Sequence, residues 1–262
     1  MKILVSGGSG FIGTRFCEIF PGRVHKLRRV KSLDEIVTRM KEVNPDVVVH
    51  LAGKFVKNHT PEDVDELIDS NIRFGARLLE AMNICGVRRI VTAGTYWQHY
   101  GGEHYCPVNL YAATKQAFED ILDYYCDAKG FSSTVLLLHD TYGPNDLRGK
   151  LFTALQDMNT ITIPVEDKYI DFVYVDDVCH AISLACEETR GRSGKRRFVV
   201  STNEATTLPE AIDAWCSTTG NCIEIIRRGQ IHREMTHPIG GEWVPNWTPK
   251  YTLRDGLKKI YE

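Results

Sequence analysis

This sequence lacks the features that mark a nucleic-acid-binding or membrane protein. Its 32 basic and 34 acidic residues give a formal net charge of -2, and no long run carries a single sign. Binding to nucleic acid or to a membrane surface needs a concentrated basic patch, so neither partner is expected. Apolar runs long enough to span a bilayer are missing, as is the charged and apolar pattern of a leader peptide. We therefore expect a cytoplasmic protein.

Paired cysteines are also missing. The 8 cysteines contain no Cys-x-x-Cys pair, the spacing typical of zinc sites and redox motifs. Many of them lie in apolar segments, among them Cys17, Cys85, Cys126, Cys179 and Cys186. We predict reduced, mostly buried thiols, and neither a disulfide nor a metal site.

The N-terminus contains a strand, a glycine-rich turn and a helix in succession. The apolar strand Lys2–Ser6 is followed by Gly7-x-x-Gly10-x-x-Gly13, which also reads as Gly8-x-Gly10-x-x-Gly13, and an amphipathic helix then runs to Phe20. Glycines allow the backbone to approach a pyrophosphate, and the helix N-terminus supplies unpaired N–H groups and a positive dipole end. In this context the glycines predict a dinucleotide-binding site.

The end of the second predicted strand bears on the choice of cofactor. This strand, Arg23–Leu27, should end near the adenosine ribose, where Asp or Glu meets a free 2′-hydroxyl and guanidinium meets a 2′-phosphate. Arg28 and Arg29 stand there, and the first acidic residues, Asp34 and Glu35, fall in the next helix. The sequence therefore favours NADPH over NAD, with a solvent-exposed surface pair of arginines as the alternative.

Helices and strands alternate along the rest of the first half of the chain. Further strands are predicted at Asp46–Leu51, Arg89–Thr92 and Thr134–Leu138, and helices at Ser32–Val43, Pro61–Met82 and Tyr111–Cys126. Glu35 should complete a capping box with Ser32. This order is typical of an α/β fold, a Rossmann-type doubly wound parallel sheet with ligands at the carboxyl ends of its strands.

Beyond Pro144 the predicted elements become shorter and indicate a small C-terminal α/β substrate lobe that shares the core. Helices are predicted near Leu151–Met158, Asp176–Glu188 and Leu208–Thr218. We assign residues 1–144, with returning segments near 170–200, to a dinucleotide-binding domain, and residues 145–262 mainly to the substrate-binding lobe.

Three polar side chains should meet at the cofactor. Thr95 ends the strand that contains Ile90, while Tyr111 and Lys115 lie four residues apart and so on one face of a helix. Here the chain resembles the extended short-chain dehydrogenase/reductase family, and the resemblance covers nearly the whole chain. The motifs that carry it are Gly7-x-x-Gly10-x-x-Gly13, His50-Leu51-Ala52-Gly53, Thr95, Tyr111-x-x-x-Lys115, Tyr142-Gly143-Pro144 and Asp171-Phe172-Val173-Tyr174-Val175-Asp176-Asp177-Val178.

The resemblance implies a role for each residue of this site. Tyr111 is the general acid that protonates a carbonyl oxygen, Lys115 lowers the pKa of Tyr111 and holds the nicotinamide ribose, and Thr95 orients the carbonyl. The implied cofactor-binding residues are Gly7, Ser9, Gly10, Phe11, Ile12, Gly13, Arg28, Arg29, Leu51, Ala52, Gly53, Asn71, Ala93, Tyr111 and Lys115.

Departures from the family pattern narrow the reaction. Dehydratases of the family follow the threonine with Asp-Glu, where this chain has Tyr96-Trp97. Reductases that also epimerise carry a cysteine and a histidine where this chain has Trp97 and Asn145-Asp146, and we interpret the nearby Cys106 and His139 as structural. The resemblance thus implies an NADPH-dependent reductase of a nucleotide-linked 4-keto-6-deoxyhexose, feeding surface polysaccharide synthesis. A nucleotide-sugar 4-epimerase with tightly bound NAD, or a non-catalytic NAD(P)-sensing protein, is the alternative.

The substrate side departs further from the family. Ile170 replaces the arginine that usually precedes Asp-Phe, and Asp140 replaces an asparagine. The cations that could bind a nucleotide-sugar pyrophosphate instead are Lys150, Lys168, Arg227, Arg228 and Arg233. We predict a substrate site of Thr95, Tyr96, Trp97, Asp140, Lys150 and Arg233. His99, Tyr100 and His104 follow Trp97 in a loop that either faces the sugar or forms a surface flap. Relatives often dimerise through helices corresponding to Pro61–Met82 and Tyr111–Cys126, so the resemblance also implies a homodimer.

Overall fold

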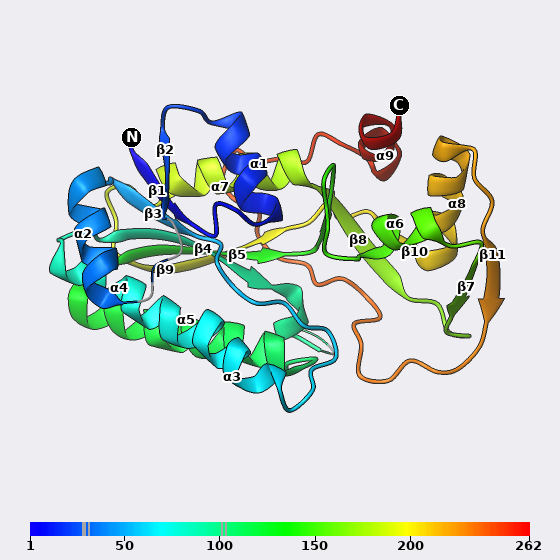
Figure 1. Ribbon diagram of the computed structural model, residues 1–262, viewed down its shortest axis with the longest axis horizontal. Helices are drawn as coiled ribbons and strands as arrows, with labels where there is room; N and C mark the ends of the chain where they lie inside the picture. The colour runs from blue at the N-terminus through cyan, green and yellow to red at the C-terminus, as the bar shows by residue number, and fades with distance from the viewer. Residues whose placement is uncertain (28–29, 31, 101, 103) are drawn as a thin grey trace.

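The computed structural model describes residues 1–27, 30, 32–100, 102 and 104–262. Its main sheet has six strands in the order β2-β1-β3-β4-β5-β9, each parallel to its neighbours (Figure 1). The strands are β1 (Ile3–Ser6), β2 (Val24–Leu27), β3 (Val47–His50), β4 (Arg89–Thr95), β5 (Ser132–Leu138) and β9 (Gly194–Val200). This confirms the predicted Rossmann-type sheet. Because the chain passes from β2 at the edge back across β1 to β3, the carboxyl ends of β1 and β3 form the switch point where ligands of such sheets bind.

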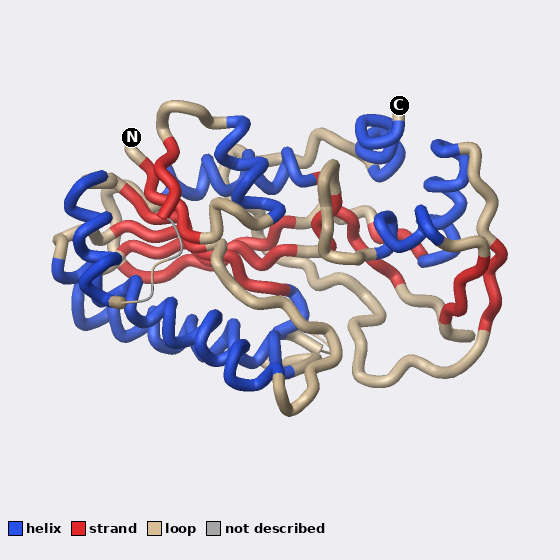
Figure 2. The backbone as a smooth tube through the Cα atoms, in the orientation of Figure 1, coloured by secondary structure: helices blue, strands red, loops and turns tan. Residues whose placement is uncertain are grey.

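Helices cover both faces of the main sheet (Figure 2). On one face lie α1 (Phe11–Ile19) and α7 (Val175–Glu188), and on the other α2 (Leu33–Val43), α4 (Phe74–Ile84) and α5 (Leu110–Lys129). Successive side chains of a strand point to opposite faces of the sheet. On β1, Leu4 packs with α2, α4 and α5, whereas Ile3 and Val5 pack with α1 and α7. The predicted capping box is present, since Ser32 Oγ accepts from Glu35 N at 3.2 Å and Glu35 Oε2 accepts from Ser32 N at 3.3 Å.

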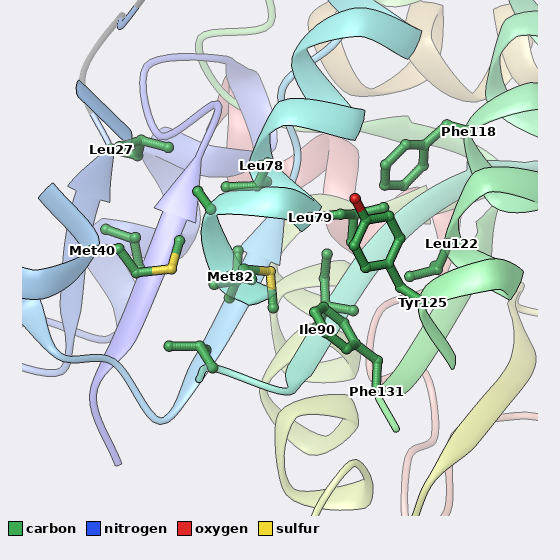
Figure 3. Packing of buried hydrophobic residues seen from close by; sticks show 14 of the residues in the cluster. Leu27, Met40, Leu78, Leu79, Met82, Ile90, Phe118, Leu122, Tyr125 and Phe131 are labelled. Atoms are coloured by element: carbon green, nitrogen blue, oxygen red, sulfur yellow. The ribbon is translucent and has the colours of Figure 1, made fainter. Parts of the chain in front are cut away.

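An apolar cluster lies between the main sheet and the helices α2, α4 and α5, and its close packing makes this layer rigid. Figure 3 shows its packing, in which side chains of α4 lie between those of α2 and α5. The labelled members are Leu27, Met40, Leu78, Leu79, Met82, Ile90, Phe118, Leu122, Tyr125 and Phe131.

The helix predicted over Pro61–Met82 is interrupted. It consists of α3 (Asp63–Ile68), a π-helical turn η1 (Asp69–Arg73) and α4. Asn71, in the middle of η1, is buried, and its Nδ2 donates to Lys54 O at 3.0 Å and to Thr114 Oγ1 at 2.8 Å. Asn71 faces inward and bonds two other segments of the chain, and the helix widens to a π-helical turn at this point. Hydrophobic spacing does not reveal such a polar contact, so the sequence predicted an uninterrupted helix.

A smaller lobe follows β5 and lies beyond the carboxyl ends of the main sheet (Figure 1). Its three-stranded sheet has the order β10-β8-β6 and a two-stranded one pairs β7 with β11. Its elements are β6 (Asp140–Tyr142), α6 (Leu151–Ala154), the 3-10 turn η3 (Leu155–Asp157), β7 (Thr160–Ile163), β8 (Tyr169–Tyr174), β10 (Ala205–Thr207), α8 (Leu208–Thr219), β11 (Glu224–Arg227) and α9 (Leu253–Tyr261). On β8, Val173 packs in the core of the main sheet and Phe172 in that of the lobe, so the two share a strand.

None of the helices in the described ranges is long and apolar enough to cross a membrane.

Candidate active site

A crevice of about 420 Å³ lies at the switch point of the main sheet. Most residues predicted to bind the cofactor or to act in catalysis line it. These are Gly7, Gly10, Phe11, Ile12, Gly13, Leu51, Gly53, Ala93, Thr95, Tyr111 and Lys115, and the predicted substrate residues Tyr96, Trp97, Asp140 and Lys150 line it as well. The fold thus brings together the turn after β1, the start of α1, the segment after β3, the end of β4, the start of α5, and β6 with the loop that follows it.

The glycine turn has the shape that a dinucleotide needs. Gly7 has φ +77°, and a Cβ there would overlap the backbone of Leu51 and Ala52. A Cβ on Gly13 would overlap the Gly7 carbonyl oxygen, so the start of α1 packs directly on the turn. Gly10 is the N-cap of α1 and has no side chain to cap it, which leaves the first N–H groups for an anionic ligand. These residues therefore fit the pyrophosphate of a nicotinamide dinucleotide.

Other predicted cofactor residues lie behind or beside the crevice. Asn71 Oδ1 accepts from Lys54 N at 2.7 Å, so Asn71 braces the segment after β3 from behind. Ser9 is exposed on the turn, and Ala52 lies beside the lining, where its backbone meets Gly7. Arg28 and Arg29, on which the choice of NADPH rests, lie outside the described residues.

The three predicted catalytic side chains share the crevice. Thr95 ends β4 and caps the 3-10 turn η2 (Tyr96–Gln98): its Oγ1 accepts from Trp97 N at 3.3 Å. A hydroxyl that accepts in this way still has its own proton to donate. Tyr111 and Lys115 lie in the first turns of α5, whose N-cap Asn109 accepts from Ala112 N at 3.0 Å.

Burial dominates the ionisation of Tyr111 and Lys115. It raises the pKa of Tyr111 to about 12 and lowers that of Lys115 to about 8, against the opposing influence of Glu119. We expected Lys115 and the positive charge of the bound cofactor together to lower the pKa of the phenol. In the protein alone, desolvation of Tyr111 raises that pKa, and the charge that opposes the rise is Arg148.

Arg148 is a residue that sequence reasoning missed. Its Nε and one terminal nitrogen donate to the two carboxylate oxygens of Asp146, each at 2.7 Å, and that terminal nitrogen also donates to Thr141 O at 2.7 Å. Its guanidinium lies 4.3 Å above the ring of Phe11, at the start of α1. An arginine two residues after an aspartate in a polar loop is a weak signal, and the stacking partner is far away in sequence.

A second ion pair, between Asp140 and Lys150, lines the crevice. Asp140 accepts from Tyr96 Oη at 2.5 Å and from Lys150 Nζ at 2.8 Å. Burial would raise the pKa of Asp140, but Lys150 and the hydroxyl of Tyr96 outweigh it and lower the value to about 2. Burial and the Asp140 carboxylate raise the pKa of Tyr96 well above its ordinary value. Asp140 is thus ionised and Tyr96 keeps its proton.

Phe55, also missed in the sequence, completes an aromatic wall. Its ring packs edge-on against Tyr111, with centroids 5.1 Å apart, and lies 5.6 Å from the ring of Trp97. Lys150 Nζ lies 5.6 Å from the Phe55 ring centre. An apolar ring packed against the phenol contributes to the burial that raises the pKa of Tyr111.

A larger cleft of about 980 Å³ adjoins the crevice on the side of the small lobe. The residues that line both are Phe55, Trp97, Asp140, Thr141, Arg148 and Lys150. Lys168 lines the cleft and shares Glu234 with Lys57, at 2.9 Å and 2.7 Å. Within the described part of the chain, no group of three or more metal-ligating side chains is arranged to hold an ion.

Other predicted substrate residues lie elsewhere. Arg233 lines a separate pocket of about 160 Å³, where it donates to Pro107 O at 2.8 Å. Arg227 forms an ion pair with Asp167 at 2.9 Å. His99 and Tyr100 line another hollow rather than the sugar side. The cations that line the cleft are the predicted Lys150 and Lys168 and the unpredicted Lys57 and Arg148.

Known proteins resemble the chain along most of its length. The profile of the NAD dependent epimerase/dehydratase family matches residues 3–201. A CDP-abequose synthase of Yersinia pseudotuberculosis is 26% identical over 235 residues, covering 81% of this chain and 82% of that protein. A UDP-glucose 4-epimerase of Mycolicibacterium smegmatis is 25% identical over an alignment that covers 100% of this chain and 98% of that protein. The crystal structure of a Thermus thermophilus UDP-glucose 4-epimerase with NAD shares the fold, with a TM-score of 0.83, 23% identity and coverage of 100% and 98%.

Proposed function

The chain belongs to the NAD dependent epimerase/dehydratase family, and we propose that it is an NADPH-dependent reductase that converts a nucleotide-linked 4-keto-6-deoxyhexose to the 4-hydroxy sugar. The observation that carries the proposal is the crevice in which Thr95, Tyr111 and Lys115 lie beside an uncapped glycine turn. The similarity to CDP-abequose synthase supports the reductase, since the sequence resembles the branch that reduces such sugars.

The chain's own residues orient the carbonyl and move one proton. NADPH, when bound by the glycine turn and Lys115, would supply the hydride for the sugar carbon. Thr95 Oγ1 donates a hydrogen bond to the substrate oxygen, and Tyr111 Oη gives it a proton. Lys115, whose pKa of about 8 leaves it mainly protonated at pH 7, provides a positive charge beside this proton transfer. Phe55 and Trp97 exclude water from the site.

The pair Tyr96-Trp97 argues against dehydration. Loss of water next to the carbonyl needs an acid and a base there. Tyr96 keeps its proton engaged with Asp140, and the Trp97 indole does not titrate in the working range. Net reduction remains the simplest reaction for this constellation.

A nucleotide-sugar 4-epimerase is the second candidate. The relative from Mycolicibacterium smegmatis, aligned along the whole chain, favours it. An epimerase keeps its cofactor bound and gives product without net oxidation, which distinguishes it from the reductase. Arg28 and Arg29 support NADPH and hence the reductase on sequence grounds.

We propose the same organisation as the resemblance implies. Residues 1–144, with segments near 170–200, bind the dinucleotide, and residues 145–262 mainly bind the sugar nucleotide. The protein acts in the cytoplasm as a homodimer that pairs α3, α4 and α5 with their copies. The exposed apolar side chains Ile84 on α4 and Tyr124 on α5 support such a contact. Sedimentation that gives a monomer at micromolar concentration would exclude the dimer.

The test is cofactor oxidation by the purified protein against CDP-, dTDP-, GDP- and UDP-linked 4-keto-6-deoxyhexoses, with NADPH and NADH in parallel. Turnover of one sugar with a preference for NADPH is expected. If neither cofactor is oxidised with any sugar although both bind, the reductase is excluded. Conversion of a 4-hydroxy nucleotide sugar to its epimer with retained NAD would then identify the epimerase. If no such conversion occurs either, the sensing protein becomes the conclusion.

A further inference from the structure

Glu119 is a buried carboxylate on α5 that the proposed reaction does not use directly. It is 1% exposed and lies four residues after Lys115, on the same face of the helix. One of its carboxylate oxygens accepts from Gln98 Nε2 at 2.8 Å, and the other accepts from the guanidinium of Arg197 on β9. Burying a charge costs free energy unless the charge is paired and hydrogen-bonded, and partners from η2 and β9 meet that need.

Gln98 connects this carboxylate to Thr95. The Gln98 side chain is fully buried at the end of η2, and its Oε1 accepts from the backbone N–H of Thr95 at 2.9 Å. Its Nε2 donates to Glu119 and also to Gln116 Oε1, the latter at 2.9 Å. If the amide turned over, its N–H groups would face the Thr95 N–H and its oxygen would face the carboxylate. Glu119 therefore sets the orientation of the amide that holds the backbone at Thr95.

Gly94 leaves room for this arrangement. It lies on β4 directly before Thr95. A Cβ on Gly94 would lie 3.0 Å from Gln98 Oε1 and 3.1 Å from Glu119 Oε1. Contacts that short would force the amide or the carboxylate to shift. The absence of a side chain on Gly94 thus lets both polar groups lie close to the strand that ends in the crevice.

The charge of Glu119 also acts on Lys115. Burial lowers the pKa of Lys115 to about 8, and Glu119 opposes this shift. Tyr111 lies one turn before Lys115 on α5, and His50 of β3 and Arg197 of β9 are further titratable groups that face the pair. Burial and, to a smaller extent, the charge of Lys115 lower the pKa of His50 to about 3, so its imidazole is neutral at pH 7. Glu119 thus favours the protonated form of Lys115.

We propose that Glu119 is a positioning residue of the active site, which fixes the backbone at Thr95 through Gln98 and holds Lys115 in its charged form. The inference rests on the proposed function, because it takes Thr95 and Lys115 as participants in the reaction. Glu119 itself is not among the residues that line the crevice. One buried carboxylate would thus act on both the residue that orients the carbonyl and the residue that supplies the positive charge.

The first test removes the charge of Glu119. E119Q keeps an oxygen that can accept from Gln98, but Lys115 should lose its proton at a lower pH than in the wild type. We expect kcat at pH 8 to fall about five- to tenfold, while kcat at pH 6 and the sugar KM stay near wild type. Should E119Q fold poorly because Arg197 is left unpaired, the double variant E119Q/R197Q removes both charges and should still show the loss at pH 8.

The matched control is E188Q. Glu188 of α7 has a side chain that is 8% exposed, pairs with Arg192 and accepts from Thr134 Oγ1 at 2.6 Å, but it does not line the crevice. E188Q should therefore lose stability in urea unfolding without a change in the pH dependence of kcat. A loss of activity that comes only from weakened packing would appear in E119Q and E188Q alike.

The second test removes the hydrogen bonds of Gln98. In Q98M a side chain of similar length can no longer accept from the Thr95 N–H. We expect kcat to fall about tenfold at pH 6 and at pH 8 alike, with the cofactor Kd and the sugar KM within a few fold of wild type. A Q98M enzyme with the kcat of the wild type would exclude the action of Glu119 on Thr95.

A measurement without turnover completes the test. The ¹⁵N signal of Lys115 Nζ, followed through a pH titration of the free protein, should give a lower pKa in E119Q than in the wild type and E188Q. If this titration and the pH dependence of kcat are both unchanged in E119Q, with a sugar that the wild type turns over, the action of Glu119 on Lys115 is excluded and the proposed function stands. A wild type that turns over no sugar would reject the proposed function and this inference with it.

Discussion

The two sides of the crevice are built differently. On the cofactor side, the turn between β1 and α1 is shaped by backbone, and its key residues are glycines whose missing Cβ atoms allow close packing. On the sugar side, the loop after β6 presents charged side chains, each tied to a counter-charge: Lys150 to Asp140 and Arg148 to Asp146. The first side recognises a group that every enzyme using such a cofactor must bind. In the function we propose, the second binds the sugar nucleotide and carries the selectivity, so it can change without loss of the first.

Tyr111 joins the two sides, and its replacement should have the largest effect. In Y111F we expect kcat to fall about 10²- to 10⁴-fold, because the substrate oxygen loses its proton donor. Cofactor and sugar should still bind with Kd values within a few fold of wild type, as measured by calorimetry.

The control for Y111F is Y125F. Tyr125 lies on the same helix but donates to Glu80 at 2.8 Å, away from the crevice, and its replacement should leave kcat unchanged. A Y111F enzyme with comparable turnover would assign the acid to another group.

The cofactor side should respond to a single methyl group. In G13A the new Cβ must displace the Gly7 carbonyl, an overpacking that costs about 1–3 kcal/mol. We expect the Kd of the cofactor, from fluorescence titration, to rise about tenfold or more, while the free nucleotide still binds to the cleft. G240A is the matched control, because a Cβ at Gly240 meets open space. Equal weakening of cofactor and nucleotide binding in G13A would show that the two sides are not separable.

This difference also explains what the sequence could predict. The glycine turn, β1 and α1 are contiguous, and Tyr111 and Lys115 are one helical turn apart, so local patterns were sufficient for both. The parallel sheet followed from alternating periodicity. By contrast, Phe55 and Arg148 acquire their places through contacts with Tyr111 and Phe11. No periodicity or spacing rule connects such distant positions, and the π-helical turn at Asn71 was missed for the same reason.

The charged pair of the sugar side should respond to loss of its cation. In K150M the carboxylate of Asp140, whose side chain is 17% exposed, loses its partner, and we expect the free energy of unfolding to fall by about 1–3 kcal/mol. The sugar KM should rise while the cofactor Kd stays near wild type. The double variant D140N/K150M should recover most of the stability, because no unpaired charge remains. Urea unfolding measures the stability of both variants. A double variant as unstable as K150M would show that the packing of Lys150 stabilises the fold more than its charge does.

The stability difference between wild type and K150M should depend on pH. In the wild type the pKa of Asp140 is lowered to about 2 from its ordinary 3.8, so its pairing stabilises the fold fully above pH 3.8 and loses effect as pH falls towards 2. Without Lys150, burial is opposed only by the hydroxyl of Tyr96 and the charge of Lys168, so we expect the pKa of Asp140 to be higher in K150M than in the wild type. The deficit of K150M should therefore be largest at pH 7 and shrink towards pH 4, where the unpaired carboxyl takes up a proton. A deficit that is constant over this range would exclude the charge as its cause.

Arg148 is where the two sides touch, and its replacement should have the smallest but most informative effect. It stacks on Phe11 of the cofactor side, is anchored by Asp146 of the sugar side, and lowers the pKa of Tyr111. In R148Q the pKa of Tyr111 should rise, making it a weaker acid, and we expect kcat at pH 7 to fall about five- to tenfold. In the reverse direction, the pH above which alcohol oxidation becomes fast should move upward, and R148K should move it less because a positive charge remains. If the pH profile stays fixed while the cofactor Kd and the sugar KM both rise, Arg148 acts by holding Phe11 and Asp146 in place and does not affect the ionisation of Tyr111. If all three stay fixed, the two sides are independent and Tyr111 responds to its burial alone.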